Sequence, residues 1–341
     1  MSIKKIAKEA GVSTATVSRV LNNPGYKCSS EELRERIWKI ARELNYMPNE
    51  AARNLKKGIT DTSQKVWCLD VLMTRMGNLE TDPFFSELLR VIESEIHRQG
   101  CILMHIFHQP LFSNDRKCRT ENIDKVIAQM EPDGDIRSDG LIIIGKCNDN
   151  VLKKLSAKYK SIVSVNRNST NYLVDEVICD GKRIAAMAVE YLIGLGHRKI
   201  GYVGDCHNES RYKGYQDTLF QYGIDIDISF VIEAEHTEAE GYAVMERLIQ
   251  RGDAPTAIYC ANDMIAIGML KCLNKYKNRY YVPSIISSDD IEEAQYTRPM
   301  LTTVRIPKEE MGKFALYLLI DRLGGGHKGI VRTELEGKLM I

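Results

Sequence analysis

The sequence of 341 residues predicts a small all-α head followed by an α/β body of two doubly wound parallel-sheet subdomains. In the first 58 residues, apolar side chains recur three and four positions apart, which is the spacing of amphipathic helices. From residue 66 onward, short apolar strand patterns alternate with helical patterns, as in parallel sheets wrapped by helices. The length of the chain also suits one small module joined to larger ones.

The charge of the chain divides at the same place. Residues 1–60 contain 12 Lys and Arg against 6 Glu, whereas the remainder contains 35 against 40 acidic residues. A basic head on an acidic body is typical of a module that meets phosphate groups. This asymmetry favours nucleic acid as a partner of the head.

Residues 3–23 predict two helices joined by a tight turn. The first helix presents one apolar face, formed by Ile3, Ile6, Ala7 and Ala10. Gly11 can take a positive φ and end this helix, and Ser13 can cap the next one. This pattern is a helix-turn-helix, and its small, polar or cationic outer face suits a DNA major groove. An ordinary solvated hairpin is the alternative.

Two further helical segments follow in the head. Residues 31–44 predict a third amphipathic helix, which completes a small core. Residues 49–58 predict a short helix that Asn49 caps and Gly58 ends. Because so short a run is unstable alone in water, we expect it to fold against a partner. Residues 59–65 are a polar linker.

The body predicts strands and helices in regular alternation. Strands are expected at residues 66–73, 101–107, 139–145, 161–166, 199–205, 229–235 and 257–263. Helices are expected at residues 84–100, 119–130, 183–196, 211–223, 240–252 and 264–276. The segment 331–341 predicts one final strand. Ligands of such sheets bind outside the carboxyl ends of the strands, so we expect a site in a cleft between the two subdomains.

Several other chemistries are disfavoured. The nine cysteines include no C-x-x-C pair, which argues against a zinc site and a disulfide framework. Residues 140–146 fit G-x-x-x-x-G-K, but Cys147 replaces Ser/Thr and the intervening residues predict a buried strand. With no catalytic motif in view, we expect neither an enzyme nor a cofactor. The absence of a signal segment and of a membrane-length apolar stretch predicts a cytoplasmic protein with no membrane partner.

The motifs and their order resemble the LacI/GalR family of bacterial transcription regulators. The resemblance rests on AGVSTATVSRVLNN, NYMPNEAARNLKKG, LGHRKIGYVGD, PTAIYCAND and RPMLTTVRIPKEEMG. It implies a homodimeric repressor of a carbohydrate operon that binds pseudo-palindromic double-stranded DNA, with a body similar to periplasmic sugar-binding proteins. The segment 75–81 and the IIIGK run resemble repressors of β-galactoside operons, which points to a galactoside as the small-molecule effector.

The resemblance also implies which residues contact DNA. In that family the second helix reads the major groove, and a leucine of the hinge helix is wedged into the minor groove and kinks the duplex. That leucine is Leu55 here, and a plain linker contact is its alternative role. The residues expected at the DNA are Ser13, Thr14, Ala15, Thr16, Ser18, Arg19, Asn49, Arg53, Leu55 and Lys56 (or its neighbour Lys57).

For the effector, the resemblance implies a cleft lined by Phe84, Phe85, Asn166, Arg211, His236, Asn262 and Asp289. The guanidinium of Arg211 can hold two hydroxyls or a carboxylate bidentately, and Asp289 can accept from two vicinal hydroxyls. Three assignments stay open. The helix core can claim either phenylalanine, His236 stands where some relatives have a stacking tryptophan, and Asp263 can either cap a helix or contact the ligand.

The implied domain boundaries follow the family. The head spans residues 1–58 and the linker residues 59–65. The N-terminal effector subdomain comprises 66–177 and 305–332, and the C-terminal one 178–304 and 333–341.

Two alternatives to a sugar-released repressor stay open. One is a corepressor-type regulator with a purine-like ligand. The other is a sugar-binding transport protein, against which the basic head and the missing signal peptide argue.

Overall fold

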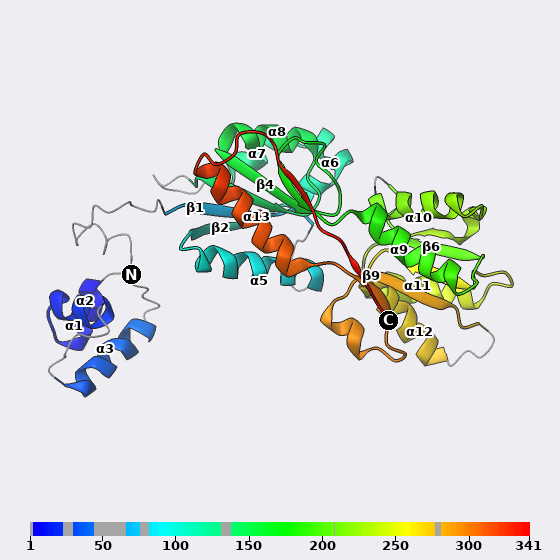
Figure 1. The fold of residues 1–341 in the computed structure, drawn as a ribbon. Coiled ribbons are helices and arrows are strands. Elements are labelled where there is room, and N and C mark those ends of the chain that lie inside the picture. The colour runs from blue at the N-terminus through cyan, green and yellow to red at the C-terminus, as the bar shows by residue number, and fades with distance from the viewer. Residues whose placement is uncertain are drawn as a thin grey trace. The chain divides into compact units, whose positions relative to one another are not determined.

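A computed structural model describes residues 3–22, 30–43, 66–75, 82–130, 138–207, 209–276 and 281–341. The chain divides into two compact units, Met1–Val66 and Trp67–Ile341, which we describe separately. Figure 1 shows both units and labels their elements. Among the described residues, no helix is long and apolar enough to cross a membrane.

The head contains the predicted helix-turn-helix. Its helices are α1 (Ile3–Ala10), α2 (Thr14–Asn22) and α3 (Glu31–Glu43). Their apolar faces meet in a small core of Ile6, Ala7, Ala10, Val17, Val20 and Ile37. Gly11 has a φ of +68°, and the turn closes through a hydrogen bond from the Val12 amide to the Ala7 carbonyl, 3.0 Å. Arg36 of α3 donates to the Ala10 carbonyl at 2.7 Å and so ties the third helix to the end of the first.

The first sheet of the body has the strand order β11-β5-β4-β3-β1-β2, and all its pairs are parallel. Its strands are β1 (Cys68–Met73), β2 (Ile102–His108), β3 (Gly140–Ile144), β4 (Ser161–Asn166), β5 (Asp175–Ile178) and β11 (Arg332–Glu334). One face is covered by α5 (Pro83–Arg98) and α13 (Lys308–Leu323), which pack against each other (Figure 1). The other face is covered by α6 (Asp115–Thr120), α7 (Ile123–Ala128) and α8 (Asp149–Lys158), with a 3₁₀ turn, η1, at Pro110–Ser113. We call this part the N-lobe.

The second sheet has the order β12-β10-β9-β8-β6-β7, in which only the β10–β12 pair is antiparallel. Its strands are β6 (Ile200–Gly204), β7 (Val231–Glu233), β8 (Ala257–Cys260), β9 (Ser284–Asp289), β10 (Thr302–Arg305) and β12 (Lys338–Met340). Its helices are α9 (Gly181–Gly194), α10 (Ser210–Gln221), α11 (Glu238–Ile249) and α12 (Asp263–Tyr276), with 3₁₀ turns η2 (Ile228–Phe230) and η3 (Glu292–Tyr296). The pairs α9–α10 and α11–α12 each pack together. We call this part the C-lobe.

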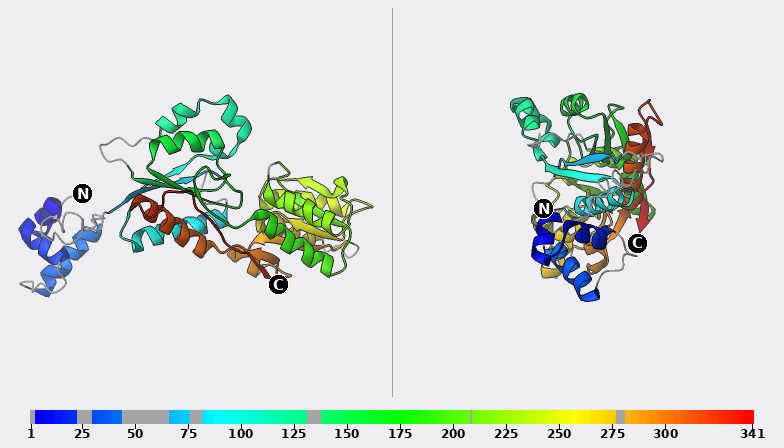
Figure 2. Two further views of the ribbon diagram at one scale, coloured as in Figure 1. Left: turned by 45° about the horizontal axis from the view of Figure 1, so that its top comes forward. Right: turned by 90° about the vertical axis from the view of Figure 1, so that its left-hand side faces the viewer.

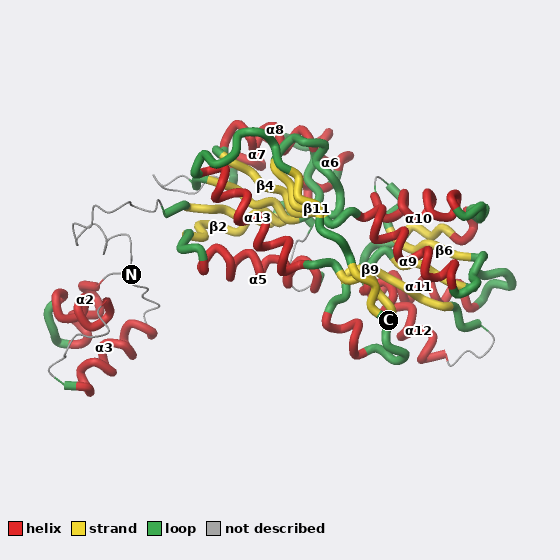
Figure 3. The backbone as a smooth tube through the Cα atoms, in the orientation of Figure 1, coloured by secondary structure: helices red, strands yellow, loops and turns green. Residues whose placement is uncertain are grey.

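Three segments of the chain connect the lobes. They lie between β5 and α9, between β10 and α13, and between β11 and β12. Figure 2 shows the body from two further sides, and Figure 3 shows the strands of the two sheets in yellow. Alternating strands and helices were predicted, and the two-sheet α/β body confirms that fold class.

Two local predictions were wrong. Residues 119–130 form parts of two short helices, because Asn122 interrupts the run and caps α7 by accepting from the Lys125 amide at 3.1 Å. The segment 331–341 forms two strands, β11 and β12, which belong to different sheets. A strand pattern alone does not say which sheet a strand will join.

Candidate functional site

Charged side chains from both lobes meet beyond the carboxyl ends of the strands. We call this region the cleft. Arg75 follows β1 and Arg167 follows β4 in the N-lobe, whereas His236 follows β7 and Asp289 ends β9 in the C-lobe. Side chains from the two lobes contact each other there, through Arg75 with His236 and through Arg167 with Asp289. The cleft is therefore lined by groups that can bind a polar ligand.

Arg211 lies at the start of α10 and is fully buried. Its Nε donates to Glu209 at 2.9 Å, and its Nη1 donates to the Ala261 carbonyl. Burial opposes ionisation of Glu209, but Arg211 and, at longer range, Arg75 hold the pKa of Glu209 far below its usual value. The pair is thus a buried, charged anchor at the floor of the cleft.

His236 lies between two guanidinium groups. Arg75 contacts its Nδ1, and Nη2 of Arg211 lies 3.3 Å from its Nε2. Burial, together with the charges of Arg75 and Arg211, lowers the pKa of His236 well below 6.5. A neutral imidazole accepts at only one ring nitrogen, so it cannot accept from both arginines at once. One of the two guanidinium N–H groups that face His236 therefore does not have the imidazole as its acceptor.

Arg167 and Asp289 form an ion pair across the cleft, and their side chains are 6% and 3% exposed. Burial raises the pKa of Asp289, and Arg167 is the strongest of the cations that oppose this rise. Asp289 also has a φ of +124°, a conformation that costs a non-glycine residue energy and is held by its surroundings. The pair links one lobe to the other.

Both phenylalanines that were expected at the ligand belong to the core. Phe84 and Phe85 are each 2% exposed and pack in the hydrophobic cluster of α5. The Arg167 guanidinium lies 4.5 Å from the centre of the Phe84 ring. Together with the Asp289 pairing, this contact fixes the plane of Arg167 over an aromatic face.

Asn262 and Asp263 have separate roles. The side chain of Asn262 accepts from the Ile265 amide at 3.1 Å and donates to the His236 carbonyl at 3.3 Å, so Asn262 caps α12 and touches the cleft. Asp263 accepts from Ser287, from Thr303 and from a backbone amide. The two roles considered for Asp263, helix cap or ligand contact, are therefore replaced by a buried structural one.

Sequence reasoning did not include four cleft residues: Arg75, Arg167, Glu209 and Lys308. Lys308 donates to the Asp289 carbonyl at 3.3 Å and pairs with Glu87 at 2.7 Å. Arg167 could have been predicted as a cleft residue, because it directly follows Asn166 at the end of a strand. Asn166 itself is 9% exposed at the end of β4 and lines a second cavity, described below.

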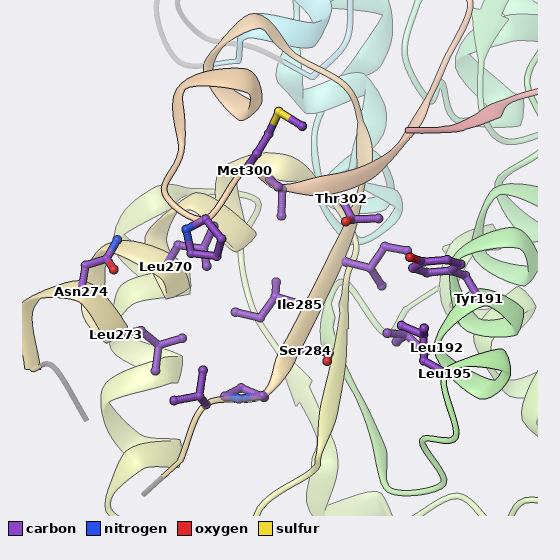
Figure 4. Close-up of a pocket in the computed structure, with 15 residues that line it drawn as sticks. Tyr191, Leu192, Leu195, Leu270, Leu273, Asn274, Ser284, Ile285, Met300 and Thr302 are labelled. Atoms are coloured by element: carbon purple, nitrogen blue, oxygen red, sulfur yellow. The ribbon is translucent and has the colours of Figure 1, made fainter. Parts of the chain in front are cut away.

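An apolar cavity of about 630 Å³ lies at the opposite end of the C-lobe sheet. Leu192, Leu273, Ile285 and Met300 are among its lining residues (Figure 4). None of the residues that line it is charged, so it does not suit a polyhydroxylated ligand. Within the described ranges, no group of three or more His, Cys, Asp or Glu residues could hold a metal ion.

In the head, Ser13 caps α2 by accepting from the Thr16 amide at 3.1 Å. Thr14 and Arg19 are exposed on the same helix, and Thr16 is half-buried. Ala15 and Ser18 also lie on α2. The remaining expected DNA contacts lie outside the described residues: Asn49, Arg53, Leu55 and Lys56.

Comparisons with known proteins define the class. Residues 2–49 match the model of bacterial regulatory proteins of the lacI family, and residues 189–341 match a periplasmic binding protein-like domain. The HTH-type transcriptional repressor MelR of Bacillus subtilis is 31% identical, over 95% of this chain and 91% of that protein. PurR of Haemophilus influenzae, also an HTH-type transcriptional repressor, is 29% identical, over 100% of this chain and 97% of that protein.

Among solved structures, the transcriptional regulator CelR in complex with cellobiose has the same fold. Its TM-score is 0.67 at 23% identity, and the match covers 100% of this chain and 98% of CelR. The protein is therefore a DNA-binding transcription regulator and not an enzyme. It belongs to the LacI family and is a repressor, with operator DNA as its partner.

Proposed function

We propose that this repressor controls a carbohydrate-utilisation operon and that a sugar bound in the cleft releases it from its operator. The observation that carries the proposal is the convergence of Arg167, Asp289, Arg211 and Asn262 beyond the strand ends. Guanidinium, carboxylate and amide groups are the donors and acceptors that match vicinal hydroxyls. The similar fold of CelR, whose structure contains cellobiose, supports a sugar.

The proposed mechanism uses the contacts between the lobes. A sugar that accepts hydrogen bonds from Arg167 and donates its hydroxyls to Asp289 replaces part of their ion pair, and so favours one arrangement of the lobes over another. The ligand must bind the two arrangements with different affinity, because otherwise it shifts nothing. In a homodimer, this change separates the two hinge segments (residues 49–58) and weakens binding to a pseudo-palindromic operator.

On the DNA side, we propose that the exposed face of α2 enters the major groove and that Leu55 is wedged into the minor groove. Thr14 and Arg19, which are exposed on α2, would read base edges. Ser13 would lie near a phosphate. Because its target is DNA, we place the protein in the bacterial cytoplasm.

The test combines ligand binding with operator release. Purified full-length chain is screened by thermal shift against mono-, di- and oligosaccharides, galactosides included, and against purines. Binding to the native state raises the Tm by mass action. Each hit is then added to a complex with a labelled duplex that was selected from random pseudo-palindromes.

A sugar that raises the Tm and releases the duplex supports the proposal. A purine that raises the Tm and tightens DNA binding instead identifies a corepressor-type regulator. If no sugar changes either quantity, the sugar proposal is wrong while the DNA-binding assignment stands.

A further inference from the structure

A second cavity of about 600 Å³ opens beside the cleft and shares Arg167 with it. Both lobes contribute to its wall. Six cationic side chains line it against the two carboxylates of Asp149 and Asp180, and these six are Arg119, Lys146, Arg167, Lys182, Lys213 and Arg332. We call it the basic cavity. Three of the six, Arg167, Lys182 and Arg332, also pair with carboxylates that do not line the cavity, namely Asp289, Asp217 and Glu334.

The first turns of three helices also meet at the basic cavity. Asp149 begins α8, Lys182 lies in the first turn of α9, and Ser210 begins α10. These helices are 10, 14 and 12 residues long, so each has a developed positive end. Backbone amides and dipoles at helix starts favour anions. The helix N-termini and the cationic side chains therefore both favour the binding of an anion.

Two of the cations carry no compensating partner. Lys182 pairs with Asp217 at 2.9 Å, and Arg332 pairs with Glu334 at 3.2 Å. By contrast, Arg119 and Lys213 are exposed and form no ion pair with any residue in the described ranges. Arg119 comes from the N-lobe and Lys213 from the C-lobe. An anion between them would contact both lobes and so would affect their arrangement.

We propose that the effector carries a phosphate or a similar dianionic group, which binds in the basic cavity while the sugar ring binds in the cleft. Arg167 belongs to both parts, and Asn166 lines the basic cavity next to it. The inference rests on the proposed function, because it adds a charged group to the sugar proposed there. A volume of about 600 Å³ lies within the usual range for small-molecule sites and accommodates such a group.

The experiment uses full-length protein and five probes: cellobiose, cellobiose 6-phosphate, lactose, lactose 6-phosphate and inorganic phosphate. Binding is measured by isothermal titration and by Tm, with NaCl added to equal ionic strength. The test variant is Arg119→Gln/Lys213→Gln, which removes two exposed charges and is expected to fold normally. The matched control is Lys328→Gln, because Lys328 is also exposed but does not line the basic cavity.

We expect at least one phosphorylated sugar to bind about tenfold or more tightly than its neutral form, since charge-assisted contacts are the strong ones. The double variant should lose this preference, whereas Lys328→Gln should keep it. Inorganic phosphate alone should raise the Tm of the wild type and not that of the double variant. That second result supports the basic cavity even if no sugar binds, in which case only the sugar proposal fails.

Three outcomes would overturn the inference. Equal affinity for neutral and phosphorylated sugars would do so while leaving the proposed function intact. A double variant with the full wild-type preference would show that the anion binds elsewhere. Failure of inorganic phosphate and of both sugar phosphates to change the Tm would mean that the cavity binds no anion.

Discussion

Arg211 is a residue whose structural and ligand-binding roles can be separated by experiment. It is fully buried and paired with Glu209, which is 3% exposed. Arg211→Ala should therefore cost about 3–5 kcal/mol, because removing one partner leaves a buried carboxylate without its charge partner. Urea unfolding measures this loss.

The double variant Arg211→Met/Glu209→Gln removes both charges and should recover much of that stability, since apolar or neutral replacements of a buried pair are often tolerated. It should still fail to respond to the effector. A double variant that regains the effector response along with its stability would show that Arg211 has only a structural role.

Asp263 should give the protein a characteristic pH dependence. Burial, followed by the charge of Asp289, raises the pKa of Asp263 to about 7. The folded state then binds more protons than the unfolded state between about pH 4 and pH 7, so this carboxyl's contribution to stability falls as the pH rises through that window.

Asp263→Asn removes this dependence. The free energy of unfolding of the variant minus that of the wild type should therefore rise between pH 5 and pH 7, by about 1.4 kcal/mol per pH unit at most. Urea unfolding at pH 5, 6 and 7 tests this. A difference that stays constant with pH would contradict a raised pKa.

At the residue scale, the resemblance to the family indicated Arg211, Asn262 and Asp289 as cleft residues. It could not indicate their partners. Arg75 and His236 are 161 positions apart and Arg167 and Asp289 are 122 apart, and no local pattern encodes such a pairing. The core position of Phe84 and Phe85 likewise depends on how α5 meets the sheet.

Among the elements, α11 and α12 cross with their backbones nearly in contact. A Cβ at Gly268 would lie 2.0 Å from the Glu238 carbonyl oxygen, and a Cβ at Gly241 would lie 2.0 Å from the Ile265 carbonyl oxygen. The lack of a side chain at each glycine therefore lets the backbone of the other helix approach closely. Side chains there would force the helices apart. The packing of α11 against α12, which positions Asn262 just before α12, would then be disturbed.

Gly268→Ala should lower the free energy of unfolding by about 2–3 kcal/mol, as overpacking of a close contact does. Gly194→Ala is a matched control, because Gly194 ends α9 with no atom within 4 Å of its would-be Cβ. Alanine there should be neutral or stabilise by up to about 1 kcal/mol. Thermal unfolding distinguishes the two. Equal effects would mean that helix propensity, and not the crossing, sets the cost.

At this scale the sequence predicted most of the structure. The three helices of the head and the alternating strands and helices have strong periodicity, which tertiary contacts reinforce. The sequence pattern was insufficient where a single residue decides whether a helix continues, as at Asn122. It was also insufficient where two strands lie in one continuous apolar pattern, as in 331–341. The assignment of β11 and β12 to different sheets follows from the packing of the lobes.

For the molecule as a whole, the proposed coupling between the body and DNA passes through residues 49–58. Leu55→Ala should weaken binding to the specific operator more than binding to random DNA, because only the kinked complex would use the wedge. Fluorescence anisotropy with both duplexes at one fixed salt concentration measures the two affinities. Equal losses on both DNAs would contradict the wedge.

The order of the chain has a consequence for its synthesis. The head lies within the first 66 residues, and its described core residues run from Ile6 to Ile37. The N-lobe, in contrast, needs α13 to cover its sheet and β11 to flank β5, and both follow the strands β6 to β10 of the C-lobe. On the ribosome, the head can therefore fold long before either sheet is closed. A chain released before residue 331 would carry a complete head on a body whose two sheets both lack an edge strand.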